Sequence, residues 1–576
     1  MKTNLVNPDF RSDYLRNLMK YRGIYDLEGY LTPSVDFLSK PTDLDNLKEG
    51  ATLLEEVIMK QLPIMLVVDC DVDGFTSSAV IYQYIKLVDP SIQIDYIIHT
   101  HKQHGLEDCI DKIINSEVKY GLVICPDSSS NDFEYHEKLK EVNIPVLVLD
   151  HHELDQEVSS NCVLINNQTS PRYYNKDLTG VGVTWQFCRY LDEIWNLEYA
   201  DQFIDLVALG VDADMGSVLS LENRYIMITG FNNIHNKFFK AAIEKQSFSM
   251  KGEVNPMSVA FYIVPMMNAM IRMGTIEEKE RLFIGLIDPD RMVESHKRGA
   301  KGTLERVCVE SLRECTNAKA HQTKAIDNMV DKLEGKIFEH GLLDNKILFI
   351  RLDDDDVFPS EINGLIAMKL SKRYKKPTIV ARLNDEGMIK GSIRGLDDCE
   401  LRDFKQFLTE SGLFEYVQGH PNAAGCSIAK KNMDKFHEYA NTALKDVDFG
   451  ENVYDINFGR IAADEDLVEL ITELSRYPDL WGQKNPTPLL GITDIVFDTD
   501  SDVSIMGKNQ DTVKIMSHGI SYIKFFAKDF IENLQNMTGR TVRMNVVGKA
   551  NLNVWMDTET PQIFIENYEL LEDNGF

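Results

Sequence analysis

The feature that most constrains the fold is a regular alternation of apolar runs and amphipathic segments that starts near residue 60. Residues 63–70, 92–100, 120–125 and 144–150 are apolar and rich in β-branched side chains, which predicts strands. The segments between them, such as 76–88, carry apolar residues at helical spacing. Strands that alternate with helices form βαβ units, so we expect an α/β fold with a doubly wound, mostly parallel sheet.

The rest of the chain indicates further domains. Helical patterns continue over 179–287, and a polar helical stretch over 302–340 indicates a connector helix. A second α/β unit begins near Asn345, and short alternating runs after a helix at 464–477 predict a small β-barrel. We therefore expect four regions, namely a lead-in and first α/β domain over 1–300, a connector helix over 301–342, a second α/β domain over 343–445 and an OB-like barrel over 446–576.

Composition limits the class of protein. The 576 residues are 43% hydrophobic and 26% charged, which is typical of globular proteins, and no run approaches the roughly 20 apolar residues that cross a membrane. The first eight residues lack the apolar core of a signal peptide, so we expect a cytoplasmic protein. The nine cysteines form no Cys-x-x-Cys pair, which argues against a zinc ribbon or a disulfide framework.

The formal net charge of −30 argues against a nucleic-acid substrate when it is taken alone. Proteins that bind nucleic acids usually present a basic surface, which releases counterions from the phosphates. The sum, however, includes carboxylates that bound divalent ions would neutralise, and a basic channel can lie within an acidic exterior. Net charge therefore weakens the case for a nucleic-acid substrate without excluding it.

Three aspartates at alternate positions, Asp69, Asp71 and Asp73, follow the first predicted strand and precede a helix. Alternate side chains of an extended segment point the same way, so two of the three can bind one cation. A solvated acidic turn or a calcium loop is the alternative, although no downstream Glu completes a calcium loop. Asp127 follows the strand at 122–125, and a single Asp in such a loop is more often a helix N-cap than a ligand.

Asp150, His151 and His152 end a further predicted strand. Adjacent carboxylate and imidazole groups bind Mn²⁺ or transition metals, and His152 can be a ligand or an outer hydrogen-bonding partner; a surface His pair is the alternative. Asp214 follows the helical run at 201–210. Three of these clusters lie at the carboxyl ends of strands in one parallel sheet, and those ends open onto a single crevice. Independent surface turns do not explain that shared placement.

Such a site suits two divalent ions, Mn²⁺ or Mg²⁺, roughly 3.5 to 4 Å apart, which activate a hydroxide for in-line attack on phosphorus. No separate general base is then required. The sequence therefore predicts a metal-dependent phosphodiesterase. The expected metal ligands are Asp69, Asp71, Asp73, Asp127, Asp150, His151 and Asp214.

The order Asp-x-Asp-x-Asp-Gly, isolated Asp, Asp-His-His and Ala-Asp resembles that of the DHH phosphoesterases, and residues 150–152 are similar to their naming motif. The likeness to RecJ-type single-stranded-DNA exonucleases covers nearly the whole chain and includes residues 178–183. Residues 481–488 are similar to the Phe-Gly-x-Gly-Asn-Pro-x-Pro element that precedes the OB-fold in that group. The resemblance implies a DHH catalytic domain, a DHHA1 substrate-binding domain and an OB-like domain.

The resemblance also implies contacts with the substrate near the reacting phosphate. Residues 265–273 are similar to a Pro-x-x-Asn-Ala-x-x-Arg-Met element, whose Asn and Arg lie beside the scissile phosphate in the family. Asn268 and Arg272 occupy these positions, and Arg272 would neutralise charge that develops on the phosphorus oxygens. A structural salt bridge is the alternative role for Arg272.

A second set of implied contacts lies in the DHHA1-like region, where Ser392 and Arg394 would hold the terminal 5′ phosphate. The family's Gly-Gly-His-x-x-Ala-Ala-Gly motif is present from its second position, with Gln418 in place of the first Gly. Residues 100–106 depart from the family's Arg-x-x-Glu-Gly-Tyr-Gly-Leu, and Lys102 would take over a phosphate contact there. The implied substrate-binding residues are Lys102, His104, Asn268, Ser392, Arg394, Gly419 and His420.

We interpret the chain as a 5′ to 3′ exonuclease that degrades single-stranded DNA to mononucleotides in DNA repair, recombination or replication. Small-substrate phosphodiesterases of the superfamily generally end after the DHHA1 domain, so the additional barrel favours a polymer. A short-oligonucleotide or cyclic-dinucleotide phosphodiesterase is one alternative, and a catalytically inactive DHH scaffold is another, against which the intact acidic motifs argue. The resemblance is compatible with a single-strand binding protein or a helicase as partner, and we expect a monomer.

Overall fold

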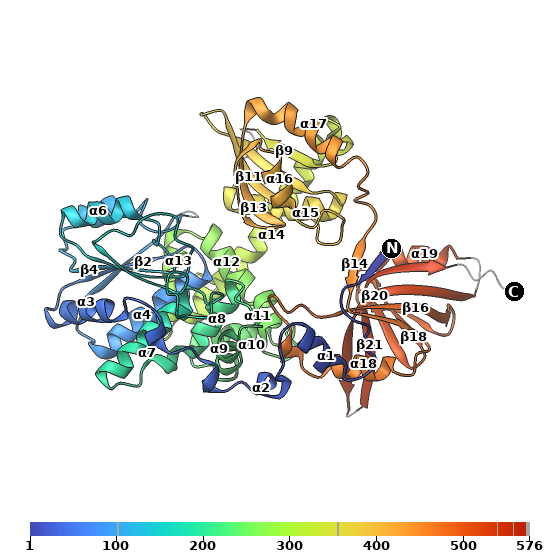
Figure 1. Cartoon of the computed structure of the whole chain (residues 1–576), viewed down its shortest axis with the longest axis horizontal. Helices are drawn as coiled ribbons and strands as arrows, with labels where there is room; N and C mark the ends of the chain where they lie inside the picture. Colours follow the sequence, from blue (N-terminus) through green and yellow to red (C-terminus); the bar gives the residue numbers. More distant parts are fainter. Residues whose placement is uncertain (101–102, 354–355, 357, 538–539, 557, 572–576) are drawn as a thin grey trace. The chain divides into compact units, whose positions relative to one another are not determined.

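A computed structural model describes residues 1–576 apart from 101–102, 354–355, 357, 538–539, 557 and 572–576. The chain divides into two compact units (Figure 1). The first unit consists of Glu28–Thr323 and Asp479–Pro486, and the second consists of Met1–Leu27, Lys324–Pro478 and Thr487–Phe576. The four regions predicted from the sequence remain a proposal, because both compact units are assembled from separate stretches of the chain.

The first unit contains a five-stranded sheet in which every pair of neighbouring strands is parallel (Figure 1). In spatial order the strands are β3 (Ile94–Ile98), β2 (Ile64–Val68), β4 (Leu122–Pro126), β5 (Val146–Asp150) and β6 (Cys162–Asn166). The first four match the predicted strands, whereas β6 is an addition to them. The expectation of a doubly wound parallel sheet is confirmed.

Strand β2 shows why its sequence is apolar without interruption. Ile64, Leu66 and Val68 belong to one hydrophobic core, while Met65 and Val67 belong to another. Successive side chains of a strand point to opposite faces, so both faces of the sheet are covered by helices and every position on this strand is buried.

Helices cover this sheet and extend the first unit. Those that carry or support the acidic motifs are α4 (Val72–Val88), α7 (Gly180–Trp195), α8 (Ile204–Ala213), α12 (Val264–Met273) and α13 (Ile276–Ile287). The others are α2 (Leu27–Leu31), α3 (Leu47–Met59), α5 (Ile110–Ile114), α6 (Phe133–Glu141), α9 (Leu221–Asn232), α10 (Lys237–Gln246) and α11 (Pro256–Tyr262).

The connector helix α14 spans Val307–Glu339 and does not begin at residue 302 as predicted. A short antiparallel hairpin, β7 (Met292–Glu294) and β8 (Leu304–Arg306), occupies the residues before it. Gly302 has a φ of +88°, which is incompatible with a right-handed helix. No sequence pattern indicates this hairpin, because both strands are short and largely exposed.

In the second unit, a five-stranded α/β sheet forms the region predicted as the second α/β domain. Its spatial order is β12 (Phe414–His420), β13 (Ala423–Ala429), β11 (Met388–Arg394), β10 (Thr378–Leu383) and β9 (Leu348–Leu352). The pair β9 and β10 is parallel, and the other pairs are antiparallel. Its helices are α15 (Asn363–Tyr374), α16 (Phe404–Glu410) and α17 (Met433–Ala443).

A seven-stranded, mainly antiparallel sheet forms the C-terminal part of the second unit (Figure 1). Two of the short alternating runs that predict the barrel, at 541–547 and 553–556, fall almost entirely on one long strand, β20, which pairs with β21 through a register shift at Val547 and Gly548. The strands are β15 (Phe458–Ile461), β16 (Leu489–Asp498), β17 (Val503–Met506), β18 (Thr512–Ser517), β19 (Ile520–Lys524), β20 (Thr541–Trp555) and β21 (Thr558–Leu571). Helices α18 (Leu467–Ser475) and α19 (Lys528–Gln535) accompany it.

The N-terminal lead-in belongs to this second unit. Strand β1 (Lys2–Leu5) pairs in parallel with β14 (Val453–Ile456), and α1 (Tyr14–Tyr21) follows it.

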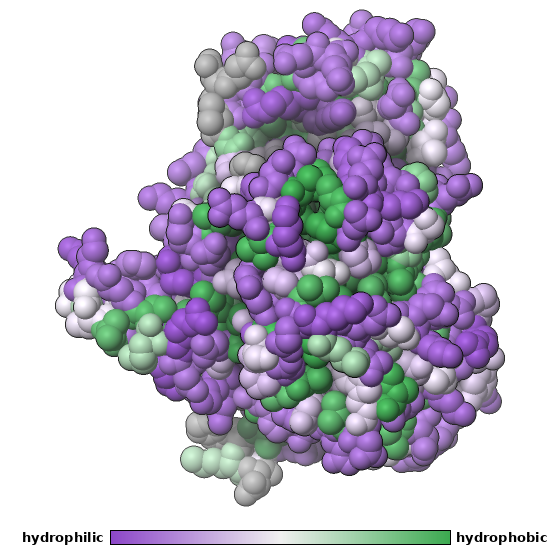
Figure 2. All heavy atoms as spheres, turned by 90° about the vertical axis from the view of Figure 1, so that its left-hand side faces the viewer, coloured by the Kyte–Doolittle hydropathy of each residue, from purple (hydrophilic) through white to green (hydrophobic). Residues whose placement is uncertain are grey.

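The face of the molecule in Figure 2 is mainly hydrophilic, with hydrophobic residues gathered in smaller areas. Within the described part of the chain, no helix has the length and apolar character needed to cross a membrane.

Candidate metal centre

The acidic motifs lie at the point of the parallel sheet where the strand order reverses. The chain passes from β2 outward to β3 and then back across β2 to β4, so β2 and β4 are neighbours with diverging connections. In open α/β sheets, ligands bind outside the carboxyl ends of the two strands at such a switch point. Asp69 follows β2, Asp127 follows β4 and Asp150 ends β5, so the fold alone brings these three carboxylates to one crevice.

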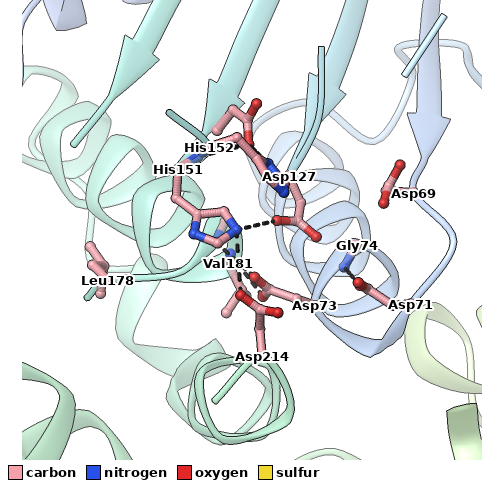
Figure 3. Close-up of polar contacts among 12 residues, drawn as sticks. Asp69, Asp71, Asp73, Gly74, Asp127, His151, His152, Leu178, Val181 and Asp214 are labelled. Carbon is pink, nitrogen blue, oxygen red and sulfur yellow. Dashed lines mark hydrogen bonds and ion pairs between the residues drawn. The ribbon is translucent and has the colours of Figure 1, made fainter. Parts of the chain in front are cut away.

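Two carboxylates of the first motif are held by backbone N–H groups. Asp71 is the N-cap of α4, and its Oδ1 accepts a hydrogen bond from the Gly74 N–H at 3.0 Å. The buried Asp73 accepts hydrogen bonds from the N–H groups of Gly180 at 2.7 Å and Val181 at 3.0 Å, which are the first residues of α7 (Figure 3). Free N–H groups at a helix N-terminus stabilise a carboxylate, so α7 fixes Asp73 in place.

Asp127 lies at the centre of the cluster (Figure 3). Its backbone is left-handed, with a φ of 63°, which is unusual for a residue other than glycine and is often found at functional sites. Its Oδ1 is 3.2 Å from Nε2 of His151 but forms no hydrogen bond of good geometry within the described part of the chain. A Cβ on Gly180 would lie 2.3 Å from this oxygen, so a larger residue there would displace the carboxylate.

The three residues of the Asp-His-His motif make different contacts. Asp150 is buried, and its Oδ1 accepts hydrogen bonds from the His151 N–H at 2.7 Å and from Nδ1 of His152 at 2.8 Å. Its Oδ2 accepts the Ser130 N–H at 3.1 Å. His151 instead turns towards the other carboxylates, with Nε2 3.5 Å from Oδ2 of Asp214. Asp150 therefore orients the two histidines, whereas His151 is directed into the cluster.

The titration of the two histidines differs because their neighbours differ. Burial and the charge of His152 lower the pKa of His151 to about 4, so its ring is neutral at pH 7 and can act as a metal ligand. Burial also opposes protonation of His152, but the hydrogen bond and charge of Asp150 outweigh it and raise its pKa to about 9. His152 is therefore the cationic partner of Asp150.

The carboxylates of the cluster repel one another. Burial, followed by the charge of Asp71, raises the pKa of Asp73 to about 7. The surrounding protein and the charge of Asp73 raise the pKa of Asp214 to about 8, although part of this side chain is exposed. Burial also raises the pKa of Asp69 and of Asp127. Buried acids that share one crevice need positive charge before all of them can ionise.

These residues fit divalent metal ions. Ligand atoms of Asp69, Asp71 and Asp127 lie within 4.8 Å of one another, as do those of Asp73, His151 and Asp214. Oδ1 of Asp127, which accepts no hydrogen bond from the described residues, faces Nε2 of His151 at 3.2 Å, so Asp127 adjoins both groups (Figure 3). Oxygen-rich donors with one imidazole suit Mn²⁺ or Mg²⁺. The donor set therefore suits two divalent ions, and Asp127 has ligand atoms near both groups.

Other predicted residues near this centre are placed as follows. Nδ1 of His104 lies 2.7 Å from Oδ2 of Asp69, so this residue adjoins the metal ligands. Asn268 and Arg272 lie one helical turn apart on α12, which packs against α4. Oδ1 of Asn268 is buried and has no hydrogen-bond partner among the described residues. Lys102 lies outside the described residues.

The residues assigned to the 5′ phosphate belong to the second unit. Ser392 and Arg394 are two residues apart on β11, so they lie on one face of the sheet. Arg394 is opposite Ala423 on β13, and Ala423 is in turn opposite His420 on β12. Gly419 has a φ of +129°, a conformation that strongly favours glycine. These four predicted residues therefore share one part of this sheet.

Sequence reasoning missed the backbone groups that support the site. The N–H groups of Gly180, Val181 and Ser130 hold Asp73 and Asp150, yet backbone donors carry no residue-type signature. In the sequence, residues 178–183 stand out only as a family-like segment. The two glycines of that segment, at the start of an apolar helix, are the signal that indicates a helix N-terminus able to receive an anion.

Comparison with known proteins identifies the class and then the family. The sequence matches the DHH family, N-terminal domain, over residues 63–211 and the RecJ OB domain over residues 459–567. The fold is similar to that of RecJ from Thermus thermophilus in complex with Mn²⁺, with a TM-score of 0.72, 17% identity and coverage of 99% of this chain and 79% of that chain. The Mg²⁺ complex of the same protein gives a TM-score of 0.65 over 98% of this chain and 78% of that chain, at 17% identity.

Two relatives of known sequence are more similar to this chain than these two structures are. The SPbeta prophage-derived YorK protein of Bacillus subtilis, named for single-strand DNA-specific exonuclease activity, is 36% identical over 98% of this chain and 96% of its own length. The single-stranded-DNA-specific exonuclease RecJ of the same bacterium is 26% identical over 94% of this chain and 65% of its own length. The chain belongs to the RecJ family of DHH phosphoesterases and is a hydrolase by that membership. The family resemblance expected from the motifs is confirmed.

The raised carboxylate pKa values predict how the metal-free protein responds to pH. Asp73 and Asp214 titrate at about 7 and about 8 in the folded protein, but near 4 when unfolded. Between these values the folded state binds more protons, so the free energy of unfolding falls as pH rises from about 4 to about 8. Thermal unfolding with chelator should therefore show a lower midpoint near pH 8 than near pH 6. The variant Asp214→Asn lacks one of the two titrating groups, so the difference between its two midpoints should be smaller, which separates this effect from other titrations.

Bound metal should also change how the unfolding midpoint depends on pH. Mn²⁺ or Mg²⁺ should raise the unfolding midpoint more near pH 8 than near pH 6, because the ions replace the protons that the carboxylates have lost. A larger metal effect at the lower pH would contradict the assigned charges.

Proposed function

We propose that this protein is a metal-dependent exonuclease that degrades single-stranded DNA from the 5′ end to mononucleotides. The observation that carries the proposal is the cluster of carboxylates and His151 at the switch point of a RecJ-family fold. Asp69, Asp71 and Asp127 would hold one ion, and Asp73, His151 and Asp214 the other, with Asp127 3.2 Å from His151. When bound, the two ions would supply an activated hydroxide and stabilise the leaving oxygen.

The chain's own residues have separate tasks in this proposal. His151 stays neutral through its lowered pKa and presents Nε2, while Asp150 orients both histidines. Arg272 would face charge on the phosphoryl oxygens, because it forms no ion pair or side-chain hydrogen bond with a described residue and has Asn268 one turn away on the same helix. Asn268 has an unsatisfied oxygen that can accept a hydrogen bond from substrate or water.

Recognition of the strand end is assigned to the second unit. Ser392 and Arg394 supply a hydroxyl and a guanidinium on one face of β11, which suits a terminal phosphate. The RecJ OB match over 459–567 supports binding of a longer strand, since OB-folds bind single strands by stacking and a charged groove. The proposal includes a monomer that acts with a single-strand binding protein or a helicase in DNA repair, recombination or replication.

The strand-end assignment predicts a specific defect. Arg394→Ala should reduce the preference for a 5′-phosphorylated over a 5′-hydroxyl strand by about tenfold or more, because one charge-assisted contact is lost. Competition between the two substrates in a single reaction measures this ratio. Arg382→Ala, which removes an arginine of the neighbouring strand that hydrogen-bonds the Asp353 carbonyl, is a control for structural disturbance. An unchanged preference in Arg394→Ala would refute this role.

The net charge of −30 favours one second candidate, a phosphodiesterase for short oligonucleotides. A comparison of kcat/KM for a 5′-phosphorylated dinucleotide and for a strand of a few dozen nucleotides separates the two. We expect the longer strand to be the better substrate. Cleavage of the dinucleotide alone would establish the second candidate instead.

A further inference from the structure

We propose that the loop of the β7–β8 hairpin, residues 295–303, is a contact surface for the phosphate backbone of single-stranded DNA. The inference rests on the proposed function and extends it by naming a surface that holds the strand outside the metal centre. We call this segment the basic loop.

The basic loop carries positive charge that no described carboxylate neutralises, in an otherwise acidic protein. Lys297, Arg298 and Lys301 are exposed, and none of them forms an ion pair or a side-chain hydrogen bond with a described residue. The arginines at the base of the same hairpin are paired, Arg291 with Asp288 at 3.0 Å and Arg306 with Asp290 at 3.7 Å. In a chain with a net charge of −30, three neighbouring cations without a carboxylate partner among the described residues indicate an external anionic ligand.

Hydrogen bonds fix the shape of the basic loop. The Ser295 N–H donates to the Thr303 carbonyl at 2.8 Å, and the Ala300 N–H donates to the Lys297 carbonyl at 3.0 Å. Gly299 has a φ of +85°, so the turn uses a conformation that suits glycine. A loop that is ordered before binding loses less entropy when it binds a ligand.

A partly buried ion network anchors this loop to α14. The Arg313 guanidinium contacts Glu305 and Glu310, and the Glu310 carboxylate also accepts the His296 N–H at 3.3 Å. Arg281 on α13 binds Glu314 with contacts of 2.7 and 3.0 Å. The hairpin is therefore attached firmly to the helices beneath it.

This network also excludes a metal site at the same place. His296, Glu310 and Glu314 offer ligand atoms within 4.8 Å of one another, but both carboxylates already bind arginines. A cation there would have to displace Arg281 and Arg313. The glutamates therefore serve the anchor and leave the exposed cations of the loop as the groups available to a ligand.

The position of the basic loop connects it to the reacting end of α12. A hollow of about 790 Å³ lies beside the loop. Lys297 and Arg298 line it together with Thr275 and Asn317, and its remaining lining includes the paired Arg281, Arg313, Glu310 and Glu314 of the anchor as well as Glu277 and Glu278. Thr275 follows Arg272 by three residues. Burial lowers the pKa of Lys319, and the charge of Arg272 lowers it further, so Arg272 lies near the part of α14 that borders this hollow. A strand bound at Arg272 thus has an adjoining concave surface with exposed cations.

Salt-dependent binding tests the proposal. The triple variant K297A/R298A/K301A is compared with the wild-type full-length protein and with K240A/K245A/K251A, which removes three exposed lysines on and after α10 and has the same net charge. The probe is a phosphorothioate-linked single strand of a few dozen nucleotides in the presence of Mn²⁺, so the metal-loaded enzyme is measured without rapid digestion. Anisotropy titrations over a range of salt concentrations give the slope of log K against log salt.

The loop variant should show a slope that is smaller in magnitude by about 2, since each phosphate contact on a single strand contributes about 0.7, and an affinity at low salt reduced tenfold or more. The control variant should keep a slope within about 0.7 of the wild-type slope, the contribution of a single contact. If the loop variant and the control behave alike while the wild type binds and digests the strand, the loop proposal is overturned and the proposed function stands. If the wild type neither binds nor digests the strand, the proposed function fails and the loop proposal fails with it.

Discussion

Asp127→Ala should lower the rate of single-strand hydrolysis by about a thousandfold or more at saturating Mn²⁺. Asp127 has ligand atoms close to those of Asp69 and Asp71, and it also lies 3.2 Å from His151, so its loss affects both ligand groups. Initial rates of mononucleotide release measure the effect. Glu134→Ala, which removes an exposed carboxylate from α6, is the matched control and should stay within about threefold of the wild type.

The stability of the same variant separates a lost ligand from a lost fold. In the metal-free protein, Asp127 is a buried carboxyl with a raised pKa and a left-handed backbone, so its removal should not lower the unfolding midpoint. Metal should then raise that midpoint less than in the wild type. Activity within tenfold of the wild type would show that the metal centre is assigned to the wrong residues.

The second large effect is expected at Asp150. Asp150→Ala removes the acceptor for three backbone N–H groups and for the His152 ring, leaving buried donors unsatisfied at a cost of about 3 kcal/mol. His151 then loses its fixed orientation, and turnover should fall by about a thousandfold. Asp150→Asn keeps a carbonyl acceptor of the same shape, so its loss in metal affinity should be smaller, about 10- to 100-fold.

This pair of variants distinguishes a positioning residue from a direct ligand. If Asp150 positions the histidines, the pKa of His152 should fall from about 9 in both variants, because its ionic partner is gone, and proton NMR of the ring follows it. Calorimetric titration with Mn²⁺ gives the metal affinity. Equal and complete loss of metal binding in both variants, together with an unchanged His152 pKa, would make Asp150 a ligand.

Strands β2, β4 and β5 of the first sheet were predictable because each of their positions is buried on one face or the other. Val146–Asp150 is apolar up to its last residue, and the Asp that ends it marks the edge where ligands bind. Strand β6 was missed because its apolar run, at residues 162–165, is only four residues long. The β7–β8 hairpin was missed for a similar reason, since Met292 and Leu304 are exposed in strands of three residues.

The side chains of the candidate site were predictable from the sequence, but the backbone groups that hold them in place were not. The acidic residues follow strands in a recognisable order, so their convergence follows from the topology. The contact between Asp73 and the start of α7 joins residues 107 positions apart in the chain, and no local pattern encodes it. The hydrogen bonds of Asp150 to both histidines indicate an orienting role that the sequence did not suggest. Its role as a metal ligand stays a prediction, since its ligand atoms lie within 4.8 Å of those of Asp127, His151 and His152.

The most direct test follows one single-stranded DNA of a few dozen nucleotides, labelled at the 5′ end in one sample and at the 3′ end in another, during digestion with Mn²⁺ and with chelator. We predict immediate release of a labelled mononucleotide from the 5′-labelled strand, a ladder of shortening products from the 3′-labelled strand, and no reaction in chelator. Release of the 3′ label first, or digestion that continues in chelator, would contradict a metal-dependent 5′ to 3′ exonuclease.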